Sequence, residues 1–427
     1  MAKTICFYED KYYQSFYPLT YVRPVYLLRT GMQELFKQVA RNFPDMDVAF
    51  ACRSQVAPLV RETCPDIPVN TIDASAGELL FVNGRIRELG DLVEQVGQVD
   101  VFTRFVTSDN EVVAILYKPD LSRSLCVSKT PAQFDELAKE NANAIETVKT
   151  TSTLYRHAWD MIADIENSIT TDFGYLRASF GDSDMTKVHE HASLVNEQNV
   201  FLAAGVEICP GAIVDASQGP VYIGANTRIE SHAAVYGPSY IGEECLILAG
   251  KVTGSSIGPG CRVGGEVEES VFQASVNKYH AGFIGHSYVA PWVNFGAMTT
   301  NSDLKNNYSS IRVSLNNELI DTGLLKLGSL IGDHTKFGIG TLLNTGINIG
   351  VCCNIFGGTL ITDKEVPSFK WGGSDGYSDY RVDKAIETAR AVVVRRGREL
   401  SVSEVELLEA LAAGKDNREG VLEFGHE

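Results

Sequence analysis

The sequence lacks a surplus of basic residues. It carries 37 Lys and Arg residues against 54 Asp and Glu residues, which gives a formal net charge of -17. Proteins that bind nucleic acid through its phosphates usually present a basic surface, so this balance argues against a nucleic-acid partner. The negative net charge is still compatible with a local basic pocket for a phosphorylated metabolite.

The sequence also lacks any apolar run that approaches the roughly 20 residues of a membrane-spanning helix. Residues 1–10 form a short apolar run that ends at Glu9 and Asp10, without the apolar core of a signal peptide. The nine cysteines form no CxxC pair and show no zinc spacing. These absences predict a cytoplasmic protein with buried free thiols and no membrane partner.

A chain of 427 residues is too long for one ordinary core and favours two domains. In the first part, apolar runs at 4–8, 47–52, 78–84 and 111–117 predict strands. A helical pattern from about 31 to 39 lies between the first two strands, another at 131–145 follows the last strand, and a third at 154–165 would bridge to the next part. Strands that alternate with helices predict an α/β domain over 1–185, with a largely parallel sheet.

From about His191 the apolar residues return at every sixth position. Two separate runs keep this spacing: Ile223, Ile229, Val235, Ile241 and Ile247, then Ile331, Phe337, Leu343, Ile349 and Ile355. Six residues turn a helix well off its own face, whereas a short strand with a tight corner fits this period. The repeat therefore predicts a parallel β-helix over 186–365, with coils stacked about 4.8 Å apart.

The repeat is interrupted between Thr299 and Leu327, where a polar, Asn-rich segment predicts a loop thrown out of the coil. After the repeat, 381–396 and 401–412 predict two helices within a C-terminal extension over 366–427. Ser401 and Glu404 fit the spacing of a capping box at the second helix. Such helices can close the end of a solenoid and protect its last strands.

Inside the repeats, the segment from Lys278 to Ser287 replaces small residues with a Lys, two His and an aromatic ring. The hexads together with this segment resemble the left-handed β-helix acyltransferases. In detail they resemble the C-terminal half of the bifunctional N-acetylglucosamine-1-phosphate uridyltransferase/glucosamine-1-phosphate acetyltransferases. The whole chain is similar to a variant group of sugar nucleotidyltransferases, on the motifs Pro18-Leu19-Thr20 with Arg23-Pro24, 275–287 and 302–308.

This resemblance implies an acetyl-CoA-dependent reaction with His280 as the catalytic general base. It further implies a sugar contact for Asn294, and a main-chain N–H beside the acyl-CoA thioester for Ala297. Phe283 stands where the family has a Tyr, and Glu268 where it has a Lys for the acceptor phosphate. The family also implies a left-handed coil and a homotrimer.

Further substrate contacts are predicted around this segment. Lys278 or Lys305 could replace the missing phosphate partner, although Lys278 could equally be a solvated corner residue. His286 is either an orienting or substrate group or a structural residue, and Asp303 belongs to the matched segment 302–308. The charge run at 266–269 is more typical of a solvated face than of a metal site.

The α/β domain lacks the glycine-rich phosphate loop that related nucleotidyltransferases place after the first strand, since 8–14 contains no Gly. Arg23 and Arg29 could hold phosphate instead, or form structural ion pairs. Asn83 ends a strand where such enzymes often have a magnesium-binding Asp, so Mg²⁺ is conceivable but Asn is a poorer ligand. The Asp182-Ser183-Asp184 triplet is common in loops, and the metal ligands stay unassigned.

Together these patterns predict a sugar-nucleotide enzyme that transfers an acyl group from acetyl-CoA to an amino-sugar phosphate or nucleotide amino sugar. One alternative is that the chain only transfers a nucleotidyl group, uridylyl or thymidylyl, to a sugar-1-phosphate. Another is that it binds nucleotide sugars without catalysis, because both sites depart from the family pattern.

Overall fold

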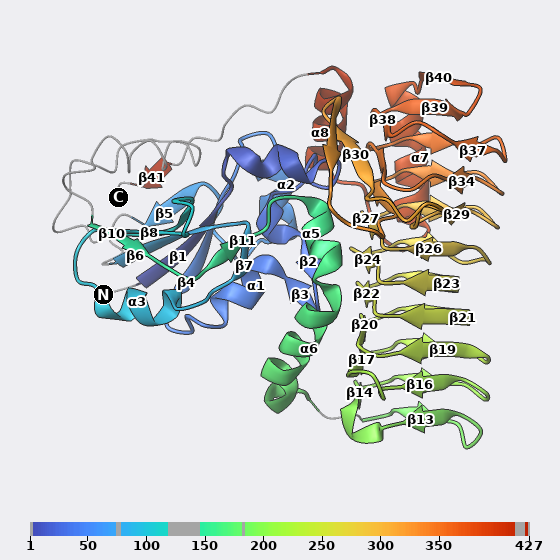
Figure 1. Cartoon of the computed structure of the whole chain (residues 1–427), viewed down its shortest axis with the longest axis horizontal. Coiled ribbons are helices and arrows are strands. Elements are labelled where there is room, and N and C mark those ends of the chain that lie inside the picture. The colour runs from blue at the N-terminus through green and yellow to red at the C-terminus, as the bar shows by residue number, and fades with distance from the viewer. Residues whose placement is uncertain (1–2, 74–77, 118–145, 182–183, 415–422, 426–427) are drawn as a thin grey trace.

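The protein consists of an α/β domain that lies against the side of a long solenoid (Figure 1). The computed structural model describes residues 3–73, 78–117, 146–181, 184–414 and 423–425. The helix predicted at 131–145 and the first two residues of the acidic triplet at 182–184 lie outside the described residues. No helix in these ranges is long and apolar enough to span a bilayer.

The sheet of the α/β domain is mixed. Its strand order is β10 (Glu146–Lys149), β8 (Thr103–Val106), β9 (Val112–Tyr117), β6 (Glu78–Asn83), β1 (Lys3–Tyr8) and β4 (Asp47–Ala51). Strand β1 runs parallel to β4 and β6, whereas β9 runs antiparallel to both of its neighbours. The α/β class is confirmed, and the antiparallel β9 explains why the sheet is only partly parallel.

Short helices and ribbons complete this domain. They are α1 (Leu35–Ala40), α2 (Ala57–Thr63), α3 (Leu92–Gln98), the hairpin β2 (Arg29–Thr30) and β3 (Gln33–Glu34), and the pair β7 (Ile86–Glu88) and β11 (Thr153–Leu154). Strand β5 (Thr71–Asp73) pairs with β41 (Glu423–Gly425). The helix expected from about residue 31 begins only at Leu35, because the β2–β3 hairpin occupies its predicted first turn and Gly31 takes a φ of +62° there.

The helix predicted at 154–165 is in fact two helices, α5 (Ala158–Ala163) and α6 (Ile165–Leu176), with a break at Asp164. Asp164 is buried and accepts hydrogen bonds from Tyr155 and Arg87 at 2.7 and 2.9 Å, which ties the break to the α/β domain. Both helices lie between that domain and the solenoid (Figure 1). Their apolar side chains, Trp159 and Ile162 among them, share one core with Tyr288 and Leu330 of the solenoid.

The solenoid has three faces of stacked parallel strands. Face 1, toward α5 and α6, contains β14 (Val200–Leu202), β17 (Val221–Ile223), β20 (Ser239–Ile241), β22 (Ser256–Ile257), β24 (Val271–Phe272), β27 (Tyr288–Val289), β32 (Ser329–Ile331), β35 (Ile347–Ile349) and β38 (Glu365–Val366). Face 2 contains β12 (Lys187–Val188), β15 (Glu207–Ile208), β18 (Arg228–Ile229), the first parts of β21 (Leu246–Thr253) and β23 (Arg262–Glu268), β25 (Asn277–Lys278), β28 (Asn294–Phe295), β33 (Lys336–Phe337), β36 (Asn354–Ile355) and β39 (Lys370–Gly373).

Face 3 contains β13 (Ser193–Val195), β16 (Ile213–Asp215), β19 (Ala233–Tyr236), the last parts of β21 and β23, β26 (Phe283–Gly285), β29 (Thr300–Asn301), β34 (Leu342–Leu343) and β37 (Leu360–Ile361). The predicted parallel β-helix is thereby confirmed, with coil strands from β12 to β39. The domain limits at 185 and 365 stay predictions. The loop predicted between 299 and 327 leaves the solenoid after face 3 and carries an antiparallel hairpin, β30 (Arg312–Leu315) and β31 (Glu318–Asp321).

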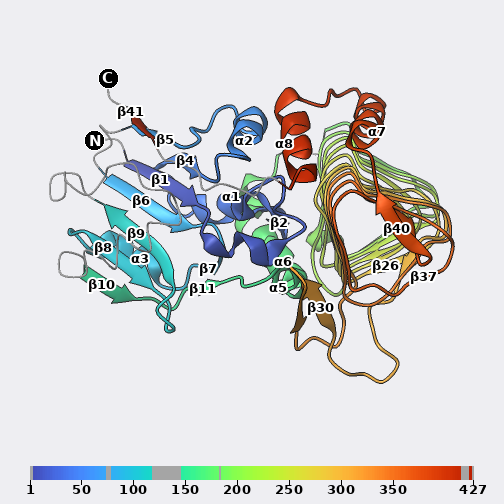
Figure 2. The same cartoon turned by 90° about the horizontal axis from the view of Figure 1, so that it is seen from above.

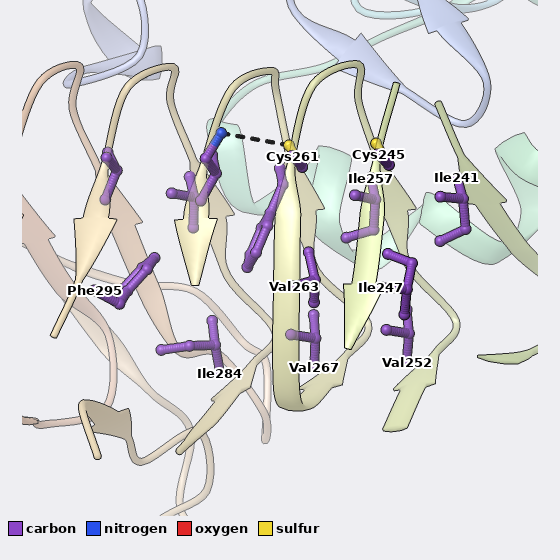
Figure 3. Packing of buried hydrophobic residues seen from close by; sticks show 14 of the residues in the cluster. Ile241, Cys245, Ile247, Val252, Ile257, Cys261, Val263, Val267, Ile284 and Phe295 are labelled. Atoms are coloured by element: carbon purple, nitrogen blue, oxygen red, sulfur yellow. Dashed lines mark hydrogen bonds between the residues drawn. The ribbon is translucent and has the colours of Figure 1, made fainter. Parts of the chain in front are cut away.

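The hexad residues point into the solenoid and fill it with stacked columns (Figure 3). The face 2 column runs Ile229, Ile247, Val263, Lys278, Phe295, Phe337 and Ile355. Lys278 is thus a buried cation in an otherwise apolar column. In the face 3 column, Asn301 takes a place that Leu343 and Ile361 hold in the following coils. Both polar exceptions lie in successive coils around the His280 segment.

The C-terminal helices are α7 (Val382–Val394) and α8 (Val402–Ala412), as predicted. They lie outside the outline of the coils, along its side, while β40 (Gly376–Asp379) pairs with β39 at the end of the stack (Figure 2). The expectation that these helices cover the last coil is therefore wrong. The capping box at α8 is half formed: Ser401 accepts from the Glu404 amide at 3.1 Å, but the Glu404 carboxylate bonds to His334 at 2.8 Å.

Candidate functional site

His280 lies in the corner between β25 and β26, where face 2 meets face 3. Its side chain is exposed, and within the described residues its ring has no hydrogen bond or ion pair, only an edge contact with Tyr279 at 5.3 Å. The corner is tight because a Cβ on Gly282, at φ +134°, would lie 2.1 Å from the Thr299 carbonyl oxygen. The backbone therefore presents a free imidazole to solvent on a rigid turn.

Lys278 supports this corner from inside the solenoid. It is 1% exposed, and its Nζ donates to the carbonyl oxygens of Gly264 at 2.7 Å and His280 at 3.0 Å. Burial lowers the pKa of Lys278 to about 8. From this position the ammonium holds the backbone of two successive corners and does not face a solvent-borne phosphate.

The next coil brings Asn294 and Ala297 to the same edge. The Asn294 Oδ1 accepts from Asn277 Nδ2 at 2.8 Å, which fixes the amide plane one strand above Asn277. The Met298 amide donates to the Ala281 carbonyl at 2.8 Å and joins the two corners. The Ala297 amide has no acceptor among the described residues, so it can donate to a bound group. The structure thus gathers His280, Asn294 and Ala297 on neighbouring coils.

His286 lies at a different corner, between face 3 and face 1. It is 6% exposed, and its Nδ1 and Nε2 lie 2.7 Å from Asp303 and 3.2 Å from Glu269. Burial lowers the pKa of His286, but the hydrogen bonds to Asp303 and Glu269 outweigh it and raise the pKa to about 9. The pair of His286 and Asp303 closes the base of the 303–327 loop, where the Leu327 amide donates to the Asp303 carbonyl at 2.8 Å.

Face 3 carries the residues that depart from the family. Phe283 is half-buried on β26, next to Glu266 of β23 in register. Glu268 forms ion pairs with Lys326 at 3.5 Å and Lys251 at 3.9 Å. Lys305 donates to the Ser310 carbonyl inside the 303–327 loop. These positions are held by neighbouring protein groups: Lys251 and Lys326 pair with carboxylates, and Lys305 donates to a carbonyl of its own loop.

A second candidate site lies at the carboxyl ends of β1 and β6, in a cavity of about 140 Å³. Asp10 accepts two bonds from Arg85 Nε, at 3.0 and 2.9 Å, and one from Asn83 at 2.9 Å. Asp10 also caps the short 3-10 helix Lys11–Phe16, which replaces a phosphate loop. Arg104 lines the cavity, and its buried Nε has no hydrogen-bond partner in the described structure.

The sequence predictions missed Asp10, Arg85 and Arg104, although Asp10 and Arg85 follow predicted strands. The same residues do not suit a magnesium ion. Asn83 Oδ1 accepts from the Arg85 amide at 3.0 Å, and both Asp10 oxygens are taken by Arg85. Within the described residues, no group of three or more His, Cys, Asp or Glu side chains could hold a metal.

Arg23 and Arg29 do not join this second site. They line a cleft of about 510 Å³ between the α/β domain, face 1 and α8. Arg23 forms an ion pair with Asp333 of the solenoid, and Arg29 pairs with Glu34 at 2.7 Å. The Arg29 amide also donates to Tyr288 Oη at 2.9 Å. Their geometry favours structural ion pairing for both, and the Arg23 ion pair and the Arg29 amide join the two parts of the chain.

Comparisons with known proteins agree with this two-part architecture. The family model for sugar nucleotidyl transferases matches residues 5–179. An uncharacterized acetyltransferase, YaiX, of Escherichia coli is 32% identical over 167 residues, which cover 38% of this chain and 72% of that protein. A bifunctional sugar-1-phosphate nucleotidylyltransferase/acetyltransferase of Sulfurisphaera tokodaii is 33% identical over 96 residues.

The match to the Sulfurisphaera protein covers 22% of this chain and spans about a quarter of that protein, 24%. The bifunctional protein GlmU of Picosynechococcus is 29% identical over 171 residues, 38% of this chain and 32% of that protein. Among solved structures, a UDP-N-acetylglucosamine acyltransferase of Campylobacter jejuni aligns at 14% identity with a TM-score of 0.33, over 54% of this chain and 98% of that one.

YaiX is thus matched over most of its own length, and the family model matches the first domain. The chain belongs to the transferases that join a sugar nucleotidyl transferase domain to a hexapeptide acetyltransferase solenoid, as a distant homologue of the bifunctional nucleotidylyltransferase/acetyltransferases.

Proposed function

We propose that the solenoid transfers an acyl group from acetyl-CoA to the amine of an amino-sugar phosphate or nucleotide amino sugar, with His280 as general base. The observation that carries this proposal is the exposed, unpaired imidazole of His280 on a corner that Gly282 and Lys278 hold rigid. Asn294 and the free amide of Ala297 lie on the adjoining coil. A base, a polar substrate contact and an oxyanion donor are thus available at one edge.

The reaction needs one proton carrier and one oxyanion donor. The acceptor amine attacks the thioester carbonyl carbon, and the imidazole of His280 takes the proton that the amine loses. The carbonyl oxygen becomes an oxyanion, which the Ala297 N–H can stabilise in the tetrahedral intermediate. The C–S bond then breaks, the imidazolium returns its proton to the departing thiolate, and the amide product forms. A homotrimer, in which a neighbouring subunit completes the acyl-CoA site, belongs to the same proposal.

Thiol release tests this proposal. The full chain is incubated with acetyl-CoA and a panel of amino-sugar phosphates and nucleotide amino sugars, and free CoA is followed with a thiol reagent. His280→Ala should lower kcat at least about 100-fold, because general base catalysis contributes this much or more. His191→Ala is the matched control, since His191 is an exposed histidine at the start of the solenoid. Release that is absent with every acceptor, or that persists in His280→Ala, contradicts the proposal.

We further propose nucleotidyl transfer to a sugar-1-phosphate in the first domain. The family match over residues 5–179 and the cavity that holds Arg85 and the unpaired Arg104 Nε support it. Pyrophosphate release from UTP or dTTP with sugar-1-phosphates is the measurement, and Arg104→Gln should lower it. Binding of a nucleotide sugar without release of pyrophosphate or CoA would instead support a binding protein.

A further inference from the structure

On face 2, beside the His280 corner, the side chains that point out of the solenoid form a column along successive strands. Backbone register places Arg228, Leu246, Arg262, Asn277, Asn294 and Lys336 one above another on successive strands. Asn277 and Asn294 are already joined by a hydrogen bond of 2.8 Å. Asn277 precedes His280 by three residues, which at strand spacing is roughly 10 Å of chain. A ligand of the size of a phosphorylated sugar can therefore reach from this column to the imidazole.

The two arginines of this column differ in their partners. Arg228 is neutralised by Glu207 at 2.6 Å and Glu230 at 2.9 Å. Arg262 is half-buried two strands above it, and within the described residues it has neither an ion pair nor a side-chain hydrogen bond. A guanidinium that is partly withdrawn from water and lacks a carboxylate is costly unless another anion binds to it. The contrast marks Arg262 as the cation with unused binding capacity.

A second guanidinium is brought to the same place by the end of α7. Arg396 is half-buried, and its Nη2 donates to Asn277 Oδ1 at 3.5 Å. Burial and the charges of Arg262 and Arg395 lower the pKa of Arg396, so the two arginines are close enough to repel each other. The helix is anchored there because Val393 and Ala389 share an apolar cluster with Trp292 of the solenoid.

The protein itself compensates this charge only weakly. The carboxyl end of α7 carries about half a negative charge, which is small against two guanidinium ions. Within the described residues, neither Arg262 nor Arg396 has an ion pair with Asp or Glu. Two such guanidinium groups beside the amide N–H groups of Asn277 and Asn294 are donors of the kind that suit a phosphate ester, which accepts several charge-assisted hydrogen bonds at once.

We propose that Arg262 and Arg396, with Asn277 and Asn294, bind the phosphate group of the acyl acceptor. This assignment rests on the proposed acyl transfer for the identity of the ligand, and it supplies the phosphate partner that Phe283 and Glu268 do not. The substrate class is then an amino sugar that carries a phosphate ester, held with its phosphate on face 2 and its amine toward His280. Discrimination against unphosphorylated amino sugars follows from the same two arginines.

The test compares four variants of the full chain: Arg262→Gln, Arg396→Gln, Arg396→Lys and, as matched control, the exposed neighbour Arg395→Gln. Calorimetric titration with inorganic phosphate, glucosamine-1-phosphate and UDP-glucosamine measures the phosphate ligands, and glucosamine serves as the unphosphorylated partner. Arg262→Gln and Arg396→Gln should weaken binding of the phosphate ligands about tenfold or more, since each removes charged hydrogen bonds. Arg396→Lys should be intermediate, and Arg395→Gln should stay within about twofold of wild type.

Several outcomes overturn the site. They are a wild-type chain that binds none of the phosphate probes, an equal effect on glucosamine, and an equal effect of Arg395→Gln. Titration with acetyl-CoA and with its analogue without the 3′-phosphate covers the other source of a phosphate ester. An arginine effect that is confined to the donor's 3′-phosphate overturns the assignment to the acceptor. Unfolding temperatures of all variants should match wild type, and Arg396→Lys keeps the test valid if a Gln variant folds poorly.

The same experiment separates this site from the proposed acyl transfer. Phosphate binding that depends on Arg262 and Arg396, in a chain that releases no CoA, keeps the site and removes the acyl transfer. CoA release that depends on His280, with acceptor KM unchanged in both Gln variants, keeps the acyl transfer and removes the site. If both hold, acceptor KM rises about tenfold in the Gln variants while the KM for acetyl-CoA stays constant.

Discussion

One coil of the solenoid holds two histidines in opposite environments. His280 lies at the corner of faces 2 and 3, exposed and without a hydrogen bond to its ring among the described residues. His286 lies at the next corner, 6% exposed and held between Asp303 and Glu269. The strand between them is the three-residue β26, so the same fold generates both environments within six residues.

The difference shows that the coil corner alone does not define the chemistry of a histidine. At His286 burial disfavours the charged ring, but two carboxylates outweigh it and hold the ring as a cation, which suits it to clamp a loop and not to accept a proton near neutral pH. At His280 the backbone is fixed by Lys278 and Gly282, while the ring is left to the substrate. Rigidity of the backbone and freedom of the ring together favour a catalytic base.

The largest effect is expected from exchanging each histidine for Asn. His280→Asn should lower kcat for CoA release about 100-fold to 10,000-fold and leave the unfolding temperature unchanged. His286→Asn should leave kcat nearly unchanged and destabilise the loop locally, because His286 lies away from the catalytic corner and pairs with Asp303 at the base of that loop. Asn suits position 286, where φ is +46°. Equal losses of kcat in both variants would break the comparison, and His191→Asn controls for removal of any exposed imidazole.

The next effect concerns the stability of the loop that His286 clamps. Breaking a buried ion pair costs about 3–5 kcal/mol, and the 39% exposure of Glu269 reduces this to roughly 2–3 kcal/mol for His286→Asn. The loss should be local, at the amides of Leu327 and Gly328, which donate to the carbonyls of Asp303 and His286. Hydrogen exchange of these amides measures it. Protection equal to wild type would show that the clamp contributes nothing.

Much of the fold was predictable because period six is a property of neighbouring residues. The hexads kept register on both sides of the 299–327 interruption, and the coils follow them. The break of one predicted helix at Asp164 was not predictable, because Asp164 is held by Arg87, far away in sequence. The position of α7 along the side of the coils depends likewise on Trp292 and other distant residues.

The position of a candidate site residue was predictable where its own sequence segment determines it, and less predictable where distant partners determine its role. His280, Asn294 and Ala297 lie on neighbouring coils, and the roles that the resemblance implies for them stay predictions. Lys278 was open between a phosphate contact and a solvated corner, but its register with Val263 turns it inward. Arg23 could not be distinguished from a phosphate ligand by sequence, because its partner Asp333 lies 310 residues later. The sequence did not predict a binding role for Arg396, because only the fold brings it next to Asn277.

A smaller effect is expected from pH. The pKa of His286 is raised to about 9 in the folded protein, whereas an unperturbed histidine titrates near 6.5. A raised pKa stabilises the fold fully below pH 6.5, and this contribution is lost as pH rises through about 9. Protection of the Leu327 and Gly328 amides, corrected for intrinsic exchange, should therefore fall by about 1 kcal/mol between pH 8 and 9.5.

The groups that face His286 support this sign. The pKa values of both acidic partners, Asp303 and Glu269, are lowered. At Asp303 burial raises the pKa, but the hydrogen bond to His286 and nearby positive charges outweigh it. At Glu269 the hydrogen bond to His286 is the largest cause of the lowering of the pKa. The charge of Lys326 lowers the pKa values of both carboxyl groups further. Glu166 of α6 is the other nearby acid: burial and the charge of Glu269 raise its pKa, and His286 lowers it. Asp303→Asn should flatten the decline by removing one partner. A decline that persists unchanged in Asp303→Asn would assign the pH dependence to another group.

The smallest effect tests whether Lys278 supports the free histidine. Lys278→Met keeps a long side chain in the face 2 column but removes the two bonds from Nζ to the carbonyls of Gly264 and His280. The solenoid should stay folded, because Met suits an apolar column between Val263 and Phe295. The His280 corner should become less well positioned, so kcat should fall about fivefold while the acetyl-CoA KM changes little. Lys336→Met is the matched control, because Lys336 likewise donates from a partly buried Nζ to two carbonyls, of Trp292 and His334, in another corner. An equal fall in both variants would mean that general loosening of the coils, and not support of His280, lowers the rate.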